Sequence, residues 1–439
     1  MTPQILERSE HRISRRDIDS NVLKVLYRLI RAGHIAYIVG GGVRDLMLGR
    51  RPKDFDIATS AHPHQVRELF RNSRLIGRRF RLVHVFFGRQ NIEVATFRRP
   101  SEEIAEENDP IIRHDNTFGT PEEDAFRRDF TVNALFYDVR TFQVIDYIGG
   151  LEDLSRRVVK TIGDPEVRMR EDPVRMIRAI RMSARFGFSI DPATEAAILR
   201  HREDLRKASP ARLVEETYRT FGMAGAAAAL DLAAQYKLLD ILLPPLGVHM
   251  LHGTGQGRSR TAVNMAQLER VTGGAVADRV SVLASLFLDF FLEKKAIRAP
   301  ADIRELVTEL RVRGFARIDT ERMRFILETF PYMLNPDRRV LKLARRPYFR
   351  EARDFYHLMA PNYGADPKKL DFYVESPPRE KAGEHASFAP GRRRRHRRRR
   401  RRKPVKPVNG AAASPQPFEH PASDFAHAGS RAFDPAQSH

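Results

Sequence analysis

The feature that most constrains the fold of this chain is a change of pattern near Gly150. Before it, short β-rich segments bounded by turn residues recur, and after it strand signals stop and apolar residues recur at helical spacing. We therefore predict an α+β chain, with a mixed α/β domain followed by an all-helical remainder. The predicted strands are 36–41 (AYIVGG), 54–59 (DFDIAT), 81–88 (RLVHVFFG), 91–98 (NIEVATFR) and 143–149 (QVIDYIG).

Composition changes divide the chain further. After the helical part, Pro, Gly, Ser, Ala and Arg dominate, a composition that is typical of disorder. The expected parts are a loose leader (1–20), an α/β head domain (21–150), a helical neck (151–225), a helical body (226–375) and a disordered Arg-rich tail (376–439).

The charge balance points to a polyanionic partner. Of 439 residues, 77 are Lys or Arg and 56 are Asp or Glu, a net charge of +21, and much of the excess lies between Arg392 and Lys406. Such a balance favours binding to RNA, DNA or a membrane surface. The absence of cysteine excludes disulfides and thiolate zinc sites. The N-terminus lacks a signal-peptide core, and the most apolar run, Val280–Leu292, is too short to span a bilayer. We therefore expect a buried helix there and a soluble, cytoplasmic protein.

Asp54 and Asp56 are the first candidates for chemistry. Residues two apart in a strand point to the same side, so both carboxylates converge on one patch. Two such charges repel unless a cation lies between them, and hard oxygen ligands select Mg²⁺. Considered alone, the Asp-x-Asp pattern equally fits a polar turn.

The preceding segment VGGGVRD favours a functional site over a polar turn. Gly40, Gly41 and Gly42 follow a predicted strand, so their N–H groups can approach an anion closely at a helix start. Arg44 is then within range of a phosphate, and Asp45 can form a local cap or ion pair. A phosphate cradle next to metal-binding carboxylates is typical of nucleotidyl transfer.

A third carboxylate would complete a site for two metal ions. Glu93 alternates with apolar residues along its predicted strand, so a metal ligand and a solvent-facing side chain are equally compatible with the pattern. Asp129 lies in RRDFTVNAL beside Arg128, which favours a functional role. Asn133, four residues later, could hydrogen-bond a ribose hydroxyl.

The segment EDPVRMIRAIR is the next constellation. On a helix, Glu171, Arg175 and Arg178 would share one face, and Asp172 would neighbour Arg175. The ordinary explanation is a surface helix with salt bridges. The alternative is a rigid row of acids and guanidinium groups that recognises the edge of a base.

Together these motifs, in this order, resemble the class II nucleotidyltransferases, which comprise tRNA CCA-adding enzymes and bacterial poly(A) polymerases. The resemblance runs from the glycines to about residue 190, with helical neck and body regions continuing to about 375. It implies the following roles: catalytic metal ligands Asp54 and Asp56, a further catalytic acid Asp129, ribose selection by Arg128 and Asn133, and base recognition by Glu171, Asp172, Arg175 and Arg178.

The segment 72–99 resembles the one that marks the bacterial poly(A) polymerases, as does the basic tail. This implies addition of AMP from ATP to RNA 3′ ends, with pyrophosphate release and two Mg²⁺ ions. The alternatives are a tRNA CCA-, CC- or A-adding enzyme and a non-catalytic RNA-binding protein. Residues expected to bind RNA are Arg78, Arg79, Arg392, Arg393, Arg394, Arg395, Arg397 and Arg398.

Overall fold

The computed structural model describes residues 2–77, 82–99, 118–252, 256–273, 275–296 and 303–375. All described elements belong to one compact unit, Met1–Pro378. The arginines expected to bind RNA, Arg78, Arg79 and those from Arg392 to Arg398, lie outside the described residues, as does the whole predicted tail.

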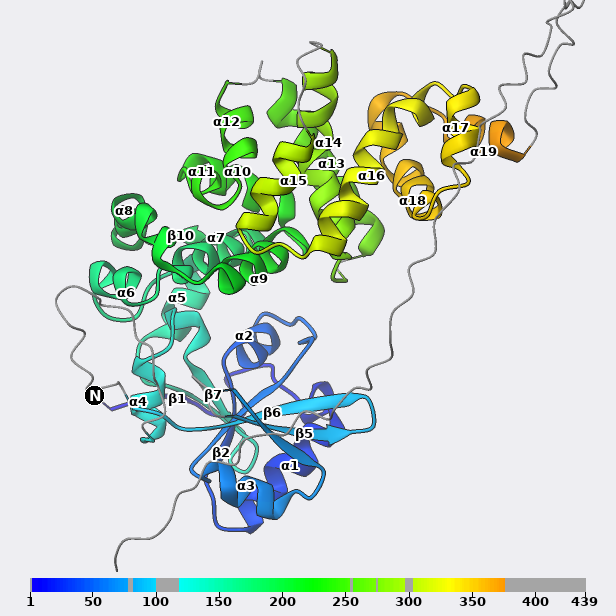
Figure 1. Cartoon of the computed structure of the whole chain (residues 1–439). Helices are drawn as coiled ribbons and strands as arrows, with labels where there is room; N and C mark the ends of the chain where they lie inside the picture. Colours follow the sequence, from blue (N-terminus) through cyan, green and yellow to red (C-terminus); the bar gives the residue numbers. More distant parts are fainter. Residues whose placement is uncertain are drawn as a thin grey trace, which may run out of the picture. The chain divides into compact units, whose positions relative to one another are not determined.

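An eight-stranded mixed sheet forms the head domain (Figure 1), with strand order β1-β8-β7-β2-β3-β6-β5-β4. Neighbouring strands are antiparallel except for β3 and β6, which run parallel. The chain returns to that parallel position through a helix, α3 (Pro63–Leu69), and two intervening strands. The strands are β1 Gln4–Leu6, β2 Ala36–Val39, β3 Asp56–Thr59, β4 Ser73–Ile76, β5 Leu82–Phe87, β6 Gln90–Thr96, β7 Leu135–Asp138 and β8 Gln143–Asp146.

Both faces of this sheet are buried, because alternate residues of its central strands enter two different hydrophobic clusters. Ile38 of β2 packs in the cluster that contains the apolar faces of α1 (Ser20–Arg31) and α2 (Gly41–Met47). Tyr37 and Val39 pack on the other face with residues near α4 (Pro121–Phe126). The central strand β2, with the sequence AYIV, is therefore fully apolar and buried rather than alternating.

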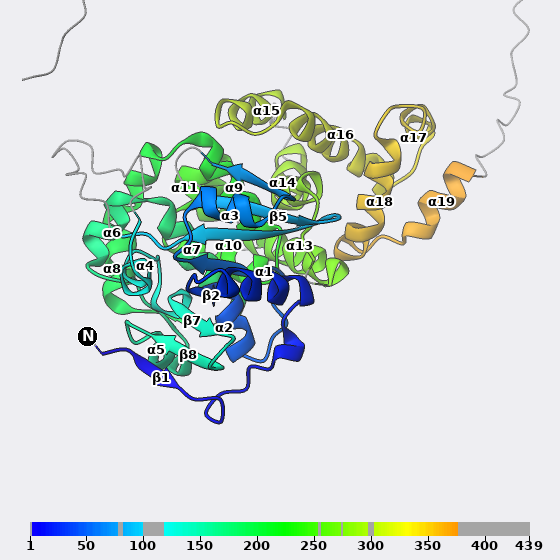
Figure 2. The ribbon, with the colours of Figure 1, turned by 90° about the horizontal axis from the view of Figure 1, so that it is seen from below.

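The leader expected over residues 1–20 is not loose in its described part. Gln4–Leu6 pairs with β8 as an edge strand, and Figure 2 shows it at the edge of the sheet remote from β5. Ile13 and Ile18 are buried in the main cluster. These few apolar residues have no periodic pattern that sequence reasoning could detect, and backbone pairing with β8 orders the segment.

The rest of the described chain is helical, with one addition. Two short strands, β9 (Val158–Val159) and β10 (Ser189–Ile190), pair in parallel within the neck. The helices are α5 Gly150–Arg156, α6 Pro165–Glu171, α7 Val174–Phe186, α8 Pro192–His201, α9 Pro210–Phe221, α10 Ala226–Gln235, α11 Leu239–Leu242, α12 Pro244–His252, α13 Gln256–Thr272, α14 Arg279–Ala296, α15 Ile303–Val312, α16 Arg317–Leu334, α17 Arg338–Leu343, α18 Phe349–Met359 and α19 Pro367–Glu375.

Local sequence signals set several of these helix ends. Asp164 and Asp191 each cap a helix whose first residue is proline, which has no N–H to leave unbonded at that position. Gly187 ends α7 in the left-handed conformation, with φ of 67°. The apolar run Val280–Leu292 forms the buried part of α14, as predicted, and no described helix is long and apolar enough to cross a membrane. The predicted α+β class is confirmed.

Candidate active site

The glycine turn is formed by the junction between β2 and α2. Gly40 has φ of 69° and ψ of −131°, a conformation that other residues rarely adopt, and a Cβ there would lie 2.9 Å from Nη1 of Arg128. A Cβ on Gly42 would lie 3.3 Å from the Phe55 ring and 3.7 Å from the backbone oxygen of Asp54. The turn thus packs directly against the Asp54–Phe55 backbone on one side and Arg128 on another.

Three carboxylates meet beside this turn. Asp56 is the first residue of β3, where it pairs with Val39 on β2 and with Glu93 on β6. Because β3 and β6 are parallel and in register, Asp56 and Glu93 project from the same face of the sheet. Asp54 lies two residues before Asp56, ahead of the first residue of β3. All three side chains are exposed. We call Asp54, Asp56 and Glu93 the carboxylate triad.

The triad concentrates negative charge at Asp56. Desolvation of the Asp56 carboxylate by the surrounding protein is the main cause that raises its pKa to about 6. The negative charges of Glu93 and Asp54 raise it further, while Arg128 opposes the shift. On the neighbouring strand, Nε2 of His84 lies 3.4 Å from Oε1 of Glu93, so this histidine orients the third carboxylate. Carboxylate oxygens are the donors that Mg²⁺ prefers, so the triad has suitable chemistry for this ion, although its oxygens do not all lie within 4.8 Å of one another in this structure.

Asp129 has a different environment. Its Oδ1 accepts hydrogen bonds from the Phe130 N–H at 2.9 Å and from Nδ2 of Asn133 at 3.0 Å. Its Oδ2 accepts from Nε of Arg178 at 2.8 Å and lies 2.6 Å from Nη2 of the same side chain. Burial alone would raise the pKa of Asp129, but Arg178 and these hydrogen bonds hold it below its usual value. Every oxygen of this carboxylate is therefore engaged by protein donors.

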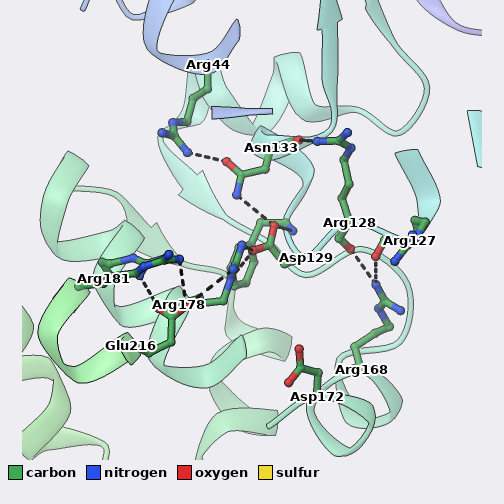
Figure 3. Close-up of polar contacts among 12 residues, drawn as sticks. Arg44, Arg127, Arg128, Asp129, Asn133, Arg168, Asp172, Arg178, Arg181 and Glu216 are labelled. Carbon is green, nitrogen blue, oxygen red and sulfur yellow. Dashed lines mark hydrogen bonds and ion pairs between the residues drawn. The ribbon is translucent and has the colours of Figure 1, made fainter. Parts of the chain in front are cut away.

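Asp129 belongs to a continuous polar network that joins the head to the neck (Figure 3). Arg44 of α2 donates to Oδ1 of Asn133, and Asn133 donates in turn to Asp129. Arg178 of α7 continues the chain, with its Nη1 lying 3.9 Å from Oε1 of Glu216 on α9. Glu216 is only 6% exposed, and this buried carboxylate pairs with Arg178 and Arg181 of α7 as well as with Arg219 of its own helix.

Arg44, predicted to lie within range of a phosphate, is buried in this network. Its Nε and Nη2 donate to Oδ1 of Asp45 at 2.9 and 2.7 Å, which is the local pairing expected for Asp45. Its guanidinium also lies 4.3 Å from the centre of the Phe186 ring, at the end of α7. Arg128, by contrast, approaches both Gly40 and Asp56, and Asp124 holds it through two hydrogen bonds of 2.8 and 3.2 Å.

The segment from Glu171 to Arg178 is not one helix. α6 ends at Glu171, Asp172 adopts φ of −144°, and α7 begins after Pro173, because the residue before a proline avoids the helical conformation. Because of this bend, Glu171 and Asp172 have different hydrogen-bond partners. Glu171 accepts from Nη1 of Arg175 at 3.2 Å, whereas Asp172 accepts a two-bond fork from Arg212 of α9 at 2.7 and 2.8 Å.

Several arginine side chains cluster near these acids. Arg168 of α6 donates to the backbone oxygens of Arg127 and Arg128 at 2.7 and 2.8 Å, so it clamps the segment before Asp129 (Figure 3). Burial, and then the charges of Arg98, Arg128, Arg168 and Arg175, lower the pKa of Arg127 to about 8. So many positive charges in one buried place favour an anion.

Sequence reasoning missed the partners that hold the motif residues. Asp124 stands four residues before Arg128, a spacing that does signal a helical ion pair. Arg168 likewise stands three residues before its partner Glu171 on α6. Arg212 and Glu216 carry no such signal, since the fold alone brings these residues of α9 to α6 and α7.

A cavity of about 850 Å³ opens beside Asp54. Its charged lining is predominantly basic, although it includes Asp17 and Asp19 besides Asp54. It is formed by the N-terminal segment, the β2–β3 connection and the β5–β6 hairpin. We call this the basic groove. Its cationic residues are Arg12, Arg16, Arg50, Arg51, Lys53 and Arg89.

Comparisons with known proteins agree with this geometry. Residues 36–160 match the family model of the poly A polymerase head domain, and residues 187–249 match the model described as "Probable RNA and SrmB- binding site of polymerase A". The chain is 46% identical over 285 residues to the poly(A) polymerase I of Salmonella typhi, an alignment covering 63% of this chain and 61% of the relative. It is 41% identical over 201 residues to the CCA-adding enzyme of Lactobacillus helveticus, covering 46% and 49%.

Among solved structures, the Bacillus stearothermophilus CCA-adding enzyme in complex with CTP superposes with a TM-score of 0.60 at 28% identity. That superposition covers 81% of this chain and 80% of the other. In sequence, however, the chain spans only about three fifths of the length of the Salmonella relative.

Proposed function

We propose that the protein adds adenylates from ATP to RNA 3′ ends without a template, because residues 36–160 match the family model of the poly A polymerase head domain. The 3′-oxygen of the RNA attacks the α-phosphorus of ATP, a new P–O bond forms, and pyrophosphate leaves. The observation that carries the proposal is the carboxylate triad of Asp54, Asp56 and Glu93 beside the glycine turn. We place the reaction in the cytoplasm.

The triad would hold Mg²⁺, which when bound supplies charge neutralisation and activation of the attacking hydroxyl. Asp56 at the start of β3 and Glu93 on the adjacent strand would supply oxygens from the same face of the sheet, and Asp54, two residues before Asp56, would supply a third ligand. His84 keeps Glu93 oriented through its Nε2 contact. Glu93 is therefore the third carboxylate of the metal site in this proposal, and Asp129 instead positions Arg178.

The triphosphate would lie against the glycine turn and Arg128. This arginine stands next to Gly40 and acts electrostatically on Asp56, so one guanidinium lies near both the phosphate cradle and the metal ligands. Arg44 would act indirectly, because its donors hold Asp45 and Asn133. Asn133, fixed at both ends of its amide by Arg44 and Asp129, would present a rigid edge toward the ribose.

The base would be recognised by the bend between α6 and α7. Asp172 supplies acceptors, Arg175 and Arg178 supply donors, and Asp129, Glu171 and Arg212 hold them in place. Recognition of a base edge requires donors and acceptors at fixed spacing, and the contacts of Asp129, Glu171 and Arg212 with these side chains would fix that spacing. The RNA strand would approach through the basic groove, whose six cations contact phosphates without regard to sequence.

A tRNA CCA-adding enzyme is the second candidate, since the solved neighbour with CTP shares the fold. The higher identity to a poly(A) polymerase, 46% against 41%, and the basic groove favour general RNA tailing. A non-catalytic RNA-binding protein would have no use for three converging carboxylates.

The test is an incorporation assay with Mg²⁺, using tRNA that lacks its 3′ end and an unrelated RNA, each with ATP or CTP. We expect AMP addition to both RNAs and little CMP addition. CTP use confined to tRNA would refute the polymerase assignment in favour of CCA addition. Asp54→Ala with Asp56→Ala should abolish incorporation while RNA binding persists, and full activity in that variant would overturn the metal assignment.

A further inference from the structure

A buried group of titratable side chains lies in the helical body, on helices that the proposed reaction does not use. His249 of α12 and Asp289 and Glu293 of α14 each offer one donor atom, and these three atoms all lie within 4.8 Å of one another. Their helices pack against each other and against α13 (Figure 1). We call these three residues the body cluster.

Asp289 is the residue that requires explanation. Its side chain is 0% exposed, and within the described part of the chain neither of its carboxylate oxygens has a hydrogen-bond partner. Nε2 of His249, which is also buried, lacks a described partner as well. Buried carboxylates are normally paired or hydrogen-bonded, because removal from water without compensation is costly. A cation bound at this place would supply the missing compensation.

The neighbouring cations do not fill this role in the described structure. Nη1 of Arg260 lies 4.0 Å from Oδ1 of Asp289, and the Arg260 side chain is 53% exposed. A protonated His249 could bridge the two acids, but its Nε2 is 3.9 Å from Asp289 and its Nδ1 is 3.6 Å from Glu293, both beyond hydrogen-bonding distance. These spacings leave room for an ion between the donors.

We propose that the body cluster binds a divalent transition-metal ion, with one imidazole nitrogen and two carboxylates as protein ligands. Such a mixed nitrogen and oxygen set suits Zn²⁺ or Mn²⁺ better than Mg²⁺, which prefers oxygen alone. Zinc bonds of about 2.1 Å place tetrahedral ligand atoms roughly 3.4 Å apart, so the observed group must contract slightly, by side-chain rotation.

Nearby groups fit a polar, negatively charged site. Tyr363 accepts a hydrogen bond of 2.8 Å from Asn264, and burial first, then the charges of Asp289 and Glu293, raise the pKa of its hydroxyl above its usual value. Ser285, one turn before Asp289 on α14, is fully buried and has no hydrogen-bond partner among the described residues. The ion would tie α12 to α14 and stabilise the body independently of catalysis.

The experiment uses the untagged full chain carrying Asp54→Ala and Asp56→Ala, so that the head site contributes no binding. After EDTA treatment it is titrated with Zn²⁺ and, separately, with Mn²⁺ and Mg²⁺ by calorimetry, and its melting temperature is measured with and without each ion. We expect one equivalent of Zn²⁺ or Mn²⁺ to bind and to raise the melting temperature by several degrees.

Adding Asp289→Asn should weaken that binding about 100-fold or more and abolish the metal-dependent rise. In EDTA the same substitution should raise the melting temperature, because it removes an uncompensated buried charge. Glu305→Gln, which changes an exposed carboxylate on α15, is the matched control and should leave both results unchanged. Equal binding by the Asp289→Asn and parent chains, or no binding of either transition metal, would overturn the proposal.

Discussion

The polar network at Asp129 gives a prediction that separates two roles for this residue. A catalytic acid would contact the reacting atoms or a metal, whereas in this structure the carboxylate of Asp129 holds Arg178 through contacts of 2.8 and 2.6 Å. Asp129→Asn preserves size but removes the charge. Both roles predict lost activity, so the single substitution does not distinguish them, and a second substitution at Arg178 is needed.

The size of the effect follows from burial. Breaking a buried ion pair by removing one partner typically costs about 3 to 5 kcal/mol. Arg178 is 34% exposed and Glu216 lies 3.9 Å from it as a second acid, so we expect a smaller cost than that, about 2 to 3 kcal/mol. If that free energy is fully expressed in nucleotide binding, kcat/KM for ATP falls about 30- to 150-fold.

The assay is a double-mutant cycle on kcat/KM for ATP, built from Asp129→Asn and Arg178→Gln. If Asp129 acts through Arg178, Asp129→Asn should have little further effect once Arg178→Gln is present. Arg212→Gln serves as the control background, because Arg212 pairs with Asp172 and not with Asp129, and there the effects should multiply. Independent, multiplying effects in the Arg178→Gln background would refute the positioning role and restore Asp129 as a directly catalytic acid.

Three further predictions concern the triad and the groove. Because the pKa of Asp56 is raised to about 6, protons should compete with Mg²⁺, so the Mg²⁺ concentration for half-maximal activity should rise as pH falls toward about 6; a flat dependence would contradict this. Glu93→Gln should weaken Mg²⁺ activation about tenfold or more and, by removing one of the charges that raise that pKa, flatten the pH dependence; unchanged activation would exclude Glu93 as a ligand. Replacing Arg12, Arg16 and Arg89 with Ala should reduce the salt slope of RNA affinity by about 2, measured by binding at several salt concentrations, and an unchanged slope would show that RNA does not use the groove.

Much of the head could be predicted because local patterns there coincide with the final structure. The apolar runs became β2, β3, β5, β6 and β8, and proline and glycine marked the ends of α7 and its neighbours. The strands β1, β4 and β7 were not predicted, since two of them are short and half-polar, and the third follows directly on the Asp129 motif. Strand pairing supplied what their own sequences do not signal.

The parallel register of β3 and β6 marks the limit of such reasoning at the active site. Alternation along 91–98 showed that Glu93 faces the polar side, but the same alternation fits any exposed strand residue. Only the pairing of Glu93 with Asp56, across a connection of more than thirty residues, adds it to the Asp54 and Asp56 group. Register is set by the sheet as a whole, so no local window contains that information.

The neck shows the same limit in a stronger form, and it bears on how specificity arises. Asp172, Arg175 and Arg178 were recognisable as a motif, yet the groups that fix two of them, Arg212 and Glu216, both come from α9, about forty residues later. Because Arg178 also pairs with Asp129 of the head, the proposed base-reading surface exists only when head, α7 and α9 pack together. Substitutions at α9 should therefore alter nucleotide choice without contacting the nucleotide, an effect that motif positions alone would not reveal.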